Sequence, residues 1–440
     1  MQIVLINTYD QGRQPFGLAS PAAFLRGAGH DVRCVDLTRE TLQADAIGDA
    51  GLVAFFLPMH TATRLALPVI AKVRAANPSA HVCAYGLYAP LNAALLRESG
   101  VDTILGPEFE EDLLRLAAEA PVESPGSIGR VRFIAPDRSD LPALSRYASL
   151  HVGETRKTVG YTEATRGCKH RCRHCPIVPV YDGRFRAVPV DVVLADIRAQ
   201  VAAGAAHITF GDPDFFNGPT HGLAIVTALA REHPGLTYDV TIKIEHLRAH
   251  ADALRVLRAT GCAFVTSAVE SLDDDVLARL EKGHTRADFE AVVADMASIG
   301  LALSPTFVAF TPWTTIESYR AMLDGIDRLD LVAAVSPIQY AIRLLIPQGS
   351  RMLELEDVRA RISRFDARSL THVWHHADPR VDALQHDIEQ LVGQRLTAPR
   401  GELFMHVRDL AYAAAGLALP VTPPLLSRAA IPYLDEPWYC

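Results

Sequence analysis

The chain has 440 residues, of which 49% are apolar and 21% charged, a globular composition that excludes a disordered or fibrous protein. Its 43 basic and 51 acidic residues give a formal net charge of −8 without any dense block of lysine and arginine, so nucleic acid is not expected as a partner. A chain of this length corresponds to roughly two to three domains of about 150 residues.

Seven cysteines, an odd and unevenly spaced set, argue against a disulfide framework and for a reducing compartment with one specialised metal site. The sequence begins without a basic leader, and the most apolar runs, Leu52–Leu57 and Leu410–Leu419, are shorter than the ~20 residues of a membrane-spanning helix. We therefore expect a cytoplasmic protein without a membrane partner.

Short apolar runs alternate with helical patterns in residues 1–120. Parallel strands require helical crossovers, so this alternation predicts an α/β domain with a doubly wound parallel sheet. Prolines then interrupt the pattern, which predicts a linker over residues 121–156. The expected strands of the first domain are 3–6, 32–35, 52–57, 81–85 and 101–105, with helices at 21–29, 63–75, 90–99 and 108–118.

Strand–helix alternation resumes at Tyr161 and predicts a partial (β/α)6 barrel within residues 157–348. From 349 to 440 the pattern is mainly helical, at 380–392 and 404–415, and ends in a proline-rich tail. The expected barrel strands are 161–165, 207–210, 237–244, 264–268, 303–308 and 332–340, with helices at 190–203, 222–232, 251–260, 286–300 and 316–329.

Three cysteines, Cys168, Cys172 and Cys175, stand at C-x3-C-x2-C spacing directly after the first expected barrel strand. A zinc site normally has four ligands in two close pairs, and the sequence offers no second pair nearby, although His170 or His174 could complete a zinc knuckle. Three thiolates suit an iron–sulfur cube with one iron free to bind a substrate. The surrounding basic residues favour thiolates and a negatively charged cluster.

The cysteine loop, its place in the barrel and the downstream motifs resemble the radical S-adenosylmethionine (SAM) superfamily. That resemblance implies a [4Fe-4S] cluster whose open iron chelates the amino and carboxylate groups of SAM, and whose electron breaks a carbon–sulfur bond. The sequence departs from the family at His174, where the residue before the third cysteine is usually aromatic.

The resemblance also implies that polar residues at the carboxyl ends of later strands bind SAM. Asp212 takes the place of the family's Gly-Gly-Glu-like element against the SAM amino group, while Lys243 and Glu245 would engage its carboxylate and ribose. The stretch from Ser267 to Thr285 is similar to the family's G-x-E-S…K-G-H-T pattern. The full set of expected SAM contacts is Asp212, Lys243, Glu245, Ser267, Glu270 and Arg343.

The first domain resembles the cobalamin-binding domain of one branch of this superfamily. The Asp-x-His-x-x-Gly element that supplies a lower cobalt ligand is absent, because the chain reads Thr8-Tyr9-Asp10-Gln11-Gly12 after the first strand. Two interpretations stay open: cobalamin bound without that histidine, or a retained scaffold whose groove is empty or reused. His60, after the third strand, is expected to be a hydrogen-bonded loop residue and not a cobalt ligand.

The last residue, Cys440, is a candidate ligand of the cluster or of a soft electrophile such as arsenite, the alternative being a disordered tail. The tail is similar to those of radical SAM proteins with cysteine-bearing C-termini and, more loosely, to the radical SAM enzyme of arsinothricin biosynthesis. That likeness implies transfer of the 3-amino-3-carboxypropyl group of SAM to trivalent arsenic.

These features predict a radical SAM enzyme, a transferase acting on a small molecule with an external one-electron reductant such as flavodoxin or ferredoxin. One alternative is a cobalamin-dependent radical SAM methyltransferase, or another 5′-deoxyadenosyl-radical enzyme of natural-product biosynthesis. A non-enzymatic alternative is an iron–sulfur redox sensor, in which the carboxylates at the strand ends would share no purpose.

Overall fold

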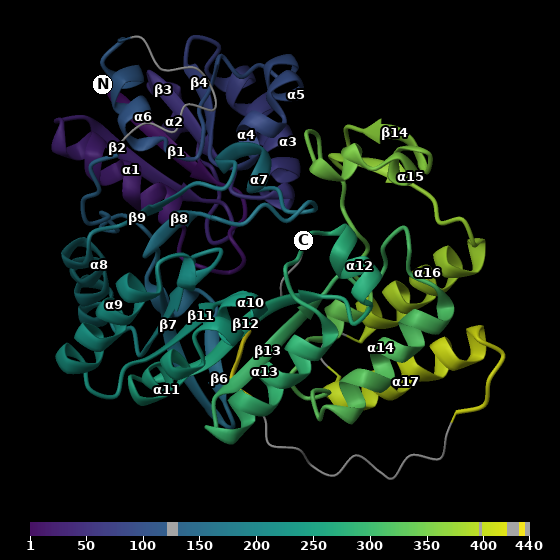
Figure 1. The fold of residues 1–440 in the computed structure, drawn as a ribbon. Coiled ribbons are helices and arrows are strands. Elements are labelled where there is room, and N and C mark those ends of the chain that lie inside the picture. The colour runs from purple at the N-terminus through teal and green to yellow at the C-terminus, as the bar shows by residue number, and fades with distance from the viewer. Residues whose placement is uncertain (121–130, 396–397, 420–430, 436–440) are drawn as a thin grey trace.

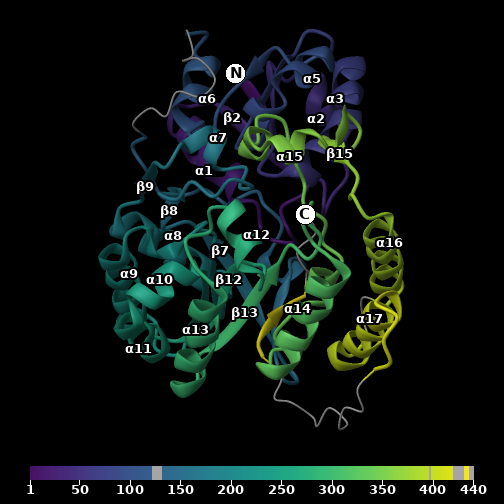
Figure 2. The same ribbon diagram turned by 45° about the vertical axis from the view of Figure 1, so that its right-hand side comes forward.

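The structure is a computed structural model, and it describes residues 1–120, 131–395, 398–419 and 431–435. An N-terminal α/β unit, purple and blue, lies against the end of a second α/β unit, teal and green (Figure 1). A C-terminal segment runs beside the second unit and reaches the first (Figure 2). Within the described residues, no helix is both long and apolar enough to cross a membrane.

The N-terminal unit consists of strands β1 (Gln2–Asn7), β2 (Asp31–Asp36), β3 (Leu52–Phe56), β4 (His81–Tyr85) and β5 (Thr103–Ile104), and helices α1 (Phe16–Gly27), α2 (Ala44–Gly48), α3 (His60–Ala76), α4 (Tyr88–Leu91), α5 (Ala93–Glu98) and α6 (Glu110–Ala117). The strands form one parallel sheet in the order β2-β1-β3-β4-β5. Ile3 and Leu5 of β1 pack with α1 and α6, whereas Val4 and Ile6 pack with α3 on the other face. Apolar burial on both faces confirms the expected doubly wound sheet.

The second unit is built on β6 (Ser149–Val152), β7 (Thr155–Thr162), β10 (His207–Phe210), β11 (Thr237–Thr241), β12 (Cys262–Glu270), β13 (Ala302–Phe307) and β16 (Tyr433–Leu434). They form a curled sheet in the order β13-β12-β11-β10-β7-β6-β16, as expected for a partial barrel. Within this sheet, the neighbouring strands β7, β10, β11, β12 and β13 run parallel, and β6 pairs antiparallel with β7 and β16. The long crossover helices are α8 (Val190–Ala202), α9 (Pro219–Glu232), α11 (Ala251–Ala259), α13 (Arg286–Ser298) and α14 (Ile316–Arg328).

Shorter elements lie around the carboxyl end of this sheet. They are the antiparallel pair β8 (Thr165–Gly167) and β9 (Phe185–Ala187), and helices α7 (Val178–Tyr181), α10 (Ile244–Ala249) and α12 (Asp274–Arg279). Gly211, which follows β10, lets that strand end approach β7, because a Cβ there would lie 1.8 Å from the hydroxyl of Tyr161. Thr285 and Thr315 begin α13 and α14 with capping boxes.

The expected sixth barrel strand at residues 332–340 is wrong, because this stretch forms turns and a short 3-10 helix at Pro337–Tyr340. Pro337 has no backbone N–H to give to a strand ladder. The sixth position is reduced to one parallel bridge between Phe310 and Arg343, where Phe310 N donates to Ile342 O over 2.9 Å.

Two further segments differ from expectation. β6 and the start of β7 lie inside the expected linker and extend the second sheet, while residues 121–130 lie outside the described residues. The C-terminal segment contains α15 (Glu356–Arg359) and an antiparallel hairpin of β14 (Ile362–Asp366) and β15 (Thr371–Trp374) before the expected helices, α16 (Pro379–Gln394) and α17 (Arg400–Ala414).

Candidate functional site

Three free thiols lie on the loop that follows β8, which we call the cluster loop (residues 168–175). Cys172 is buried, and Cys168 and Cys175 are half-buried. Burial, followed by the nearby Asp214, Cys175 and Cys172, raises the pKa of Cys168 to about 12. Burial and Cys172 likewise raise the pKa of Cys175, to about 11. Since a bound metal deprotonates its thiol ligands, these protonated thiols form a donor set for a metal cluster.

The two histidines of the cluster loop face other partners. His174 Nε2 lies 3.0 Å from Glu270 Oε1, and His170 Nε2 lies 3.1 Å from His246 Nε2 and 3.5 Å from Asp214 Oδ2. Because both rings are engaged in this way, the donor set fits a three-cysteine iron–sulfur cluster better than a four-ligand zinc knuckle. The other described cysteines are buried in strands of the two sheets: Cys34, Cys83 and Cys262.

Glu270, an expected SAM contact, lies beside the cluster loop and contacts it. It ends β12 in a left-handed backbone conformation, φ 68°, after a register shift against β13. Its carboxylate contacts His174 and lies 3.3 Å from Lys282 Nζ. Burial alone would raise the pKa of Glu270, but Lys282 and His174 lower it to about 2, so the carboxylate stays ionised. This buried ion group anchors the end of the loop.

Asp212 supports the chain that leads into the cluster loop. Its Oδ2 accepts a hydrogen bond from Ala164 N over 3.0 Å, and its Oδ1 accepts one from Thr165 Oγ1 over 2.6 Å. Burial raises its pKa to about 7. Asn217 donates to Gly167 O over 3.1 Å and holds the same segment. Both Asp212 oxygens therefore bind this chain, and the contact with the SAM amino group stays a prediction.

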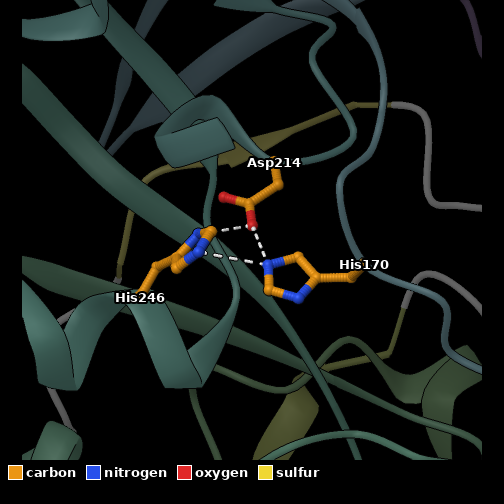
Figure 3. Close-up of side chains that lie close together, drawn as sticks. All are labelled: His170, Asp214 and His246. Carbon is orange, nitrogen blue, oxygen red and sulfur yellow. Dashed lines mark hydrogen bonds and ion pairs between the residues drawn. The ribbon is translucent and has the colours of Figure 1, made fainter. Parts of the chain in front are cut away.

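Lys243 and Glu245 lie beside the cluster loop as a pair. Lys243 Nζ is 2.9 Å from Glu245 Oε2 and 3.1 Å from His170 Nδ1. On the other side of that ring, Asp214 Oδ2 lies 2.7 Å from His246 Nδ1, and both imidazoles turn toward this carboxylate (Figure 3). Although burial alone would raise it, the two histidines hold the pKa of Asp214 below its usual value.

Two buried polar side chains near this region lack hydrogen-bond partners. Ser267 Oγ, on β12, is buried without a partner, and so are both ring nitrogens of His284. Burial, with Lys282 and Lys243, lowers the pKa of His284 to about 4. Since buried polar atoms in folded proteins nearly always have partners, these atoms fit a polar ligand bound beside the cluster loop.

Two candidates remain, Arg343 and Cys440. Arg343 donates to Asp382 over 2.8 Å and to the carbonyl of Trp374 over 2.8 Å, with its guanidinium 3.6 Å from the centroid of the Trp374 ring. It thereby joins the sixth barrel position to α16 and the hairpin. Cys440 lies outside the described residues.

A buried ion network joins the cluster loop to the N-terminal unit. Arg166, just before the first cysteine, binds both oxygens of Glu110 over 2.9 and 2.5 Å and Glu163 over 2.8 Å. Glu108 lies 3.6 Å away and accepts a hydrogen bond from Tyr181 over 2.8 Å. Because Glu108 and Glu110 belong to the N-terminal unit, this single guanidinium fixes the loop against that unit.

The carboxyl edge of the N-terminal sheet is closely packed. Phe56 lies against Gly17, where a Cβ would be 2.2 Å from the ring. Gly86, at φ +107°, lies under Leu57, whose carbonyl oxygen would be 2.9 Å from a Cβ. His60 Nε2 contacts the carbonyl of Ser369 in the turn of the β14–β15 hairpin, so the expected hydrogen bond is present, although His60 begins α3 and does not lie in a loop.

Several residues that shape this region were not among the expected site residues. Asp214 is two residues beyond Asp212, and His246 follows Glu245, so clustering of polar residues just after strand ends was the available signal. Lys282 lay in a recognised motif without a role. Nothing in the sequence pointed to the pairing of Arg166 with distant carboxylates.

Part of the second unit is similar in sequence to a known protein family. Residues 162–321 match the model of the radical SAM superfamily. A bacteriochlorophyllide d C-12(1)-methyltransferase of Chlorobaculum tepidum is 23% identical over 207 residues, covering 46% of this chain and 43% of that protein. The ribosomal protein uS12 methylthiotransferase RimO of Geobacter sulfurreducens is 23% identical over 295 residues, covering 59% and 65%. The chain thus matches less than two thirds of the length of either relative.

Solved structures share the fold over both units. The cobalamin-dependent SAM radical enzyme OxsB, with aqua-cobalamin and SAM bound, superposes with a TM-score of 0.72 at 13% identity, covering 94% of this chain and 71% of that one. The radical SAM methyltransferase TsrM from Kitasatospora setae, with cobalamin and a [4Fe-4S] cluster bound, gives a TM-score of 0.66 at 16% identity, covering 94% and 99%.

Proposed function

We propose, from the premise that this chain is an enzyme with a radical SAM domain, that it cleaves SAM reductively and transfers a group to a small molecule. The observation that carries the proposal is the cluster loop, where three free thiols share one short loop while both of its histidines contact other side chains. When bound there, a [4Fe-4S] cluster supplies the electron that breaks a carbon–sulfur bond of SAM.

In this proposal Cys168, Cys172 and Cys175 hold the cluster. The partnerless Ser267 and His284, with the Lys243–Glu245 pair, bind polar groups of SAM. Glu270, with Lys282 and His174, fixes the loop, and Glu270 and Asp212 remain proposed SAM contacts at the same strand ends.

The group transferred distinguishes two finer proposals. Methyl transfer is supported by the whole-chain fold likeness to a methyltransferase, 99% of which is covered. The N-terminal edge does not fit a histidine-ligated cobalamin, because among the described residues His60 is the imidazole at that edge and it contacts Ser369. We therefore derive no step through cobalt. Carboxypropyl transfer to trivalent arsenic rests on Cys440, outside the described residues.

Mass spectrometry of SAM fragments tests both whether SAM is cleaved and which group is transferred. Protein reconstituted without oxygen should contain about four irons per chain and cleave SAM when dithionite is added. Methyl transfer yields S-adenosylhomocysteine, carboxypropyl transfer yields 5′-methylthioadenosine, and hydrogen abstraction yields 5′-deoxyadenosine. Parallel reactions with arsenite and with cobalamin identify which addition changes the fragment.

A matched control keeps the result specific. Cys262→Ala removes a buried thiol of β12 away from the loop and should retain iron and SAM cleavage. Reconstituted protein that holds four irons but cleaves no SAM would contradict the enzyme proposal and favour a redox sensor. Zinc in place of iron would overturn the cluster itself.

A further inference from the structure

A second set of metal-ligating side chains lies beside the cluster loop. His170 belongs to the loop itself, Asp214 follows β10, and His246 lies on α10, so three separate elements converge (Figure 3). One ligand atom from each residue lies within 4.8 Å of the others. All three side chains are shielded from solvent, with exposed fractions of 14%, 2% and 6%.

The separations of these atoms match those around one divalent ion. Asp214 Oδ2 lies 2.7 Å from His246 Nδ1 and 3.5 Å from His170 Nε2. An ion with bonds of about 2.0–2.2 Å to nitrogen and oxygen keeps neighbouring ligand atoms roughly 2.8–3.5 Å apart. These two separations lie at or near that range, and all three ligand atoms lie within 4.8 Å of one another, so small side-chain shifts would bring them around a shared cation.

Hydrogen bonding leaves two of these atoms unsatisfied. Asp214 Oδ2 and His246 Nδ1 are buried and, despite their short separation, are not aligned as donor and acceptor. The other Asp214 oxygen is already used, because Oδ1 accepts a hydrogen bond from Phe216 N over 3.0 Å. Asp214 Oδ2 and His246 Nδ1 thus form a close ion pair without an aligned hydrogen bond, and a cation could bind both. The third atom, His170 Nε2, would exchange its 3.1 Å contact with His246 Nε2 for the ion.

Metal binding to His170 Nε2 would move the ring proton to the other ring nitrogen, Nδ1. Coordination through Nε2 requires the ring proton on Nδ1, where a carboxylate commonly accepts it in metal sites. In this structure Lys243 Nζ donates to Nδ1 over 3.1 Å, while Glu245 Oε2 lies 3.6 Å from the same nitrogen. Metal binding through Nε2 would therefore require Lys243 to turn away and the Glu245 carboxylate to approach Nδ1.

We propose that His170, Asp214 and His246 bind one divalent first-row metal ion of the zinc or ferrous class, separate from the cysteine cluster. Two imidazoles and one carboxylate are ligands that suit these ions and leave positions for water. The ion would join the cluster loop to α10 and to the loop after β10. This site does not depend on SAM cleavage, and it can exist in a protein that cleaves none.

Zinc content of the iron-loaded full-length chain tests the site. Protein reconstituted with iron and sulfide is equilibrated with zinc sulfate, dialysed against metal-free buffer, and analysed for both metals. We expect about one zinc per chain beyond the iron, bound roughly tenfold or more weakly in Asp214→Asn and His246→Gln at equal iron content. The control His250→Gln, at the end of the same helix, should bind zinc as the unmodified protein does.

X-ray absorption at the zinc edge provides a readout that needs no variant. The proposal predicts only nitrogen and oxygen neighbours in the first shell, whereas zinc in the cysteine loop would show sulfur. A sulfur shell overturns the site, and so does zinc content that is equal in the unmodified protein and in both ligand variants. Zinc that is washed out of every form by dialysis overturns it as well.

Discussion

The carboxyl edges of the two sheets meet at the interface between the units but are held in different ways. In the barrel, charged side chains fix the cluster loop, through the Glu270–Lys282 and Arg166–Glu110 ion pairs. In the N-terminal sheet, ring and backbone packing fix the edge, with Phe56 against Gly17. The edge beside the cluster loop is thus held mainly by ion pairs, and the edge of the N-terminal sheet mainly by close packing.

The strongest expected effect is the loss of iron and SAM cleavage when a cysteine of the cluster loop is replaced. Replacing Cys168, Cys172 or Cys175 by alanine removes one of three donors, so we expect the reconstituted protein to lose its iron and all SAM cleavage. Iron analysis and the visible absorption of the cluster measure this. Cys83→Ala, in β4 of the other sheet, is the control and should keep both; iron retained in a loop variant would contradict the ligand assignment.

The second-largest expected effect concerns the ion network of Arg166, which connects the two edges. Arg166→Met leaves Glu110 and its neighbours buried without a cation, so we expect unfolding free energy to fall by about 3–5 kcal/mol in urea titrations. Arg198→Met is the control, since Arg198 forms an exposed pair with Glu232, and such pairs contribute about 0–1 kcal/mol. Equal losses in the two variants would show that the network does not hold the units together.

The N-terminal edge has a pH-dependent group of its own. Burial, followed by Asp36 and Glu163 against an opposing Arg13, raises the pKa of Asp10 to about 7. Its stabilising contribution is present below the unfolded pKa of 3.8 and is lost as the pH rises through about 7.

Asp10→Asn should therefore stabilise the protein at pH 8 by roughly 2 to 4 kcal/mol and change little near pH 4. Urea midpoints across this pH range measure the difference. The exposed Asp31 in the same sheet is the control, and Asp31→Asn should give the same curve as the unmodified protein. A benefit of Asp10→Asn that is equal at both pH values would contradict the assignment.

The smallest effect concerns the hairpin that touches the N-terminal edge. His60→Ala removes one contact to the carbonyl of Ser369, so we expect a loss of about 1 kcal/mol with faster amide exchange in the hairpin. Hydrogen–deuterium exchange of residues 362–374 measures it. His375→Ala, whose side chain is 73% exposed, should leave that exchange unchanged.

Strand–helix alternation predicts much of the fold, and the spacing of the cysteines predicts the cluster loop. β10, for example, coincides with its expected range of 207–210, because four buried residues lie between clear helical patterns. The sixth strand failed at Pro337, whose effect on a ladder competes with the apolar run before it. The β14–β15 hairpin was missed because its strands are short and only partly buried.

The roles of individual polar residues were harder to predict than their presence. Glu270 and Asp212 are expected near SAM from their positions in motifs, and the structure adds contacts of each with this chain's own groups, which the motifs did not indicate. Such pairings depend on which loops meet in space, and a sequence gives no distance between the residue at 166 and the carboxylate at 110. The order of residues along the chain thus indicates which region of the fold a polar side chain occupies, but not which side chain it binds there.

The backbone of Glu270 carries a lasting consequence for engineering. Its left-handed conformation, φ 68°, costs a residue with a side chain roughly 1–2 kcal/mol, a penalty that glycine escapes. Glycine would also remove the carboxylate and leave Lys282 buried without its partner, a loss of about 3–5 kcal/mol that exceeds the gain. Selection for heat resistance alone should therefore retain Glu270 and its unfavourable backbone conformation.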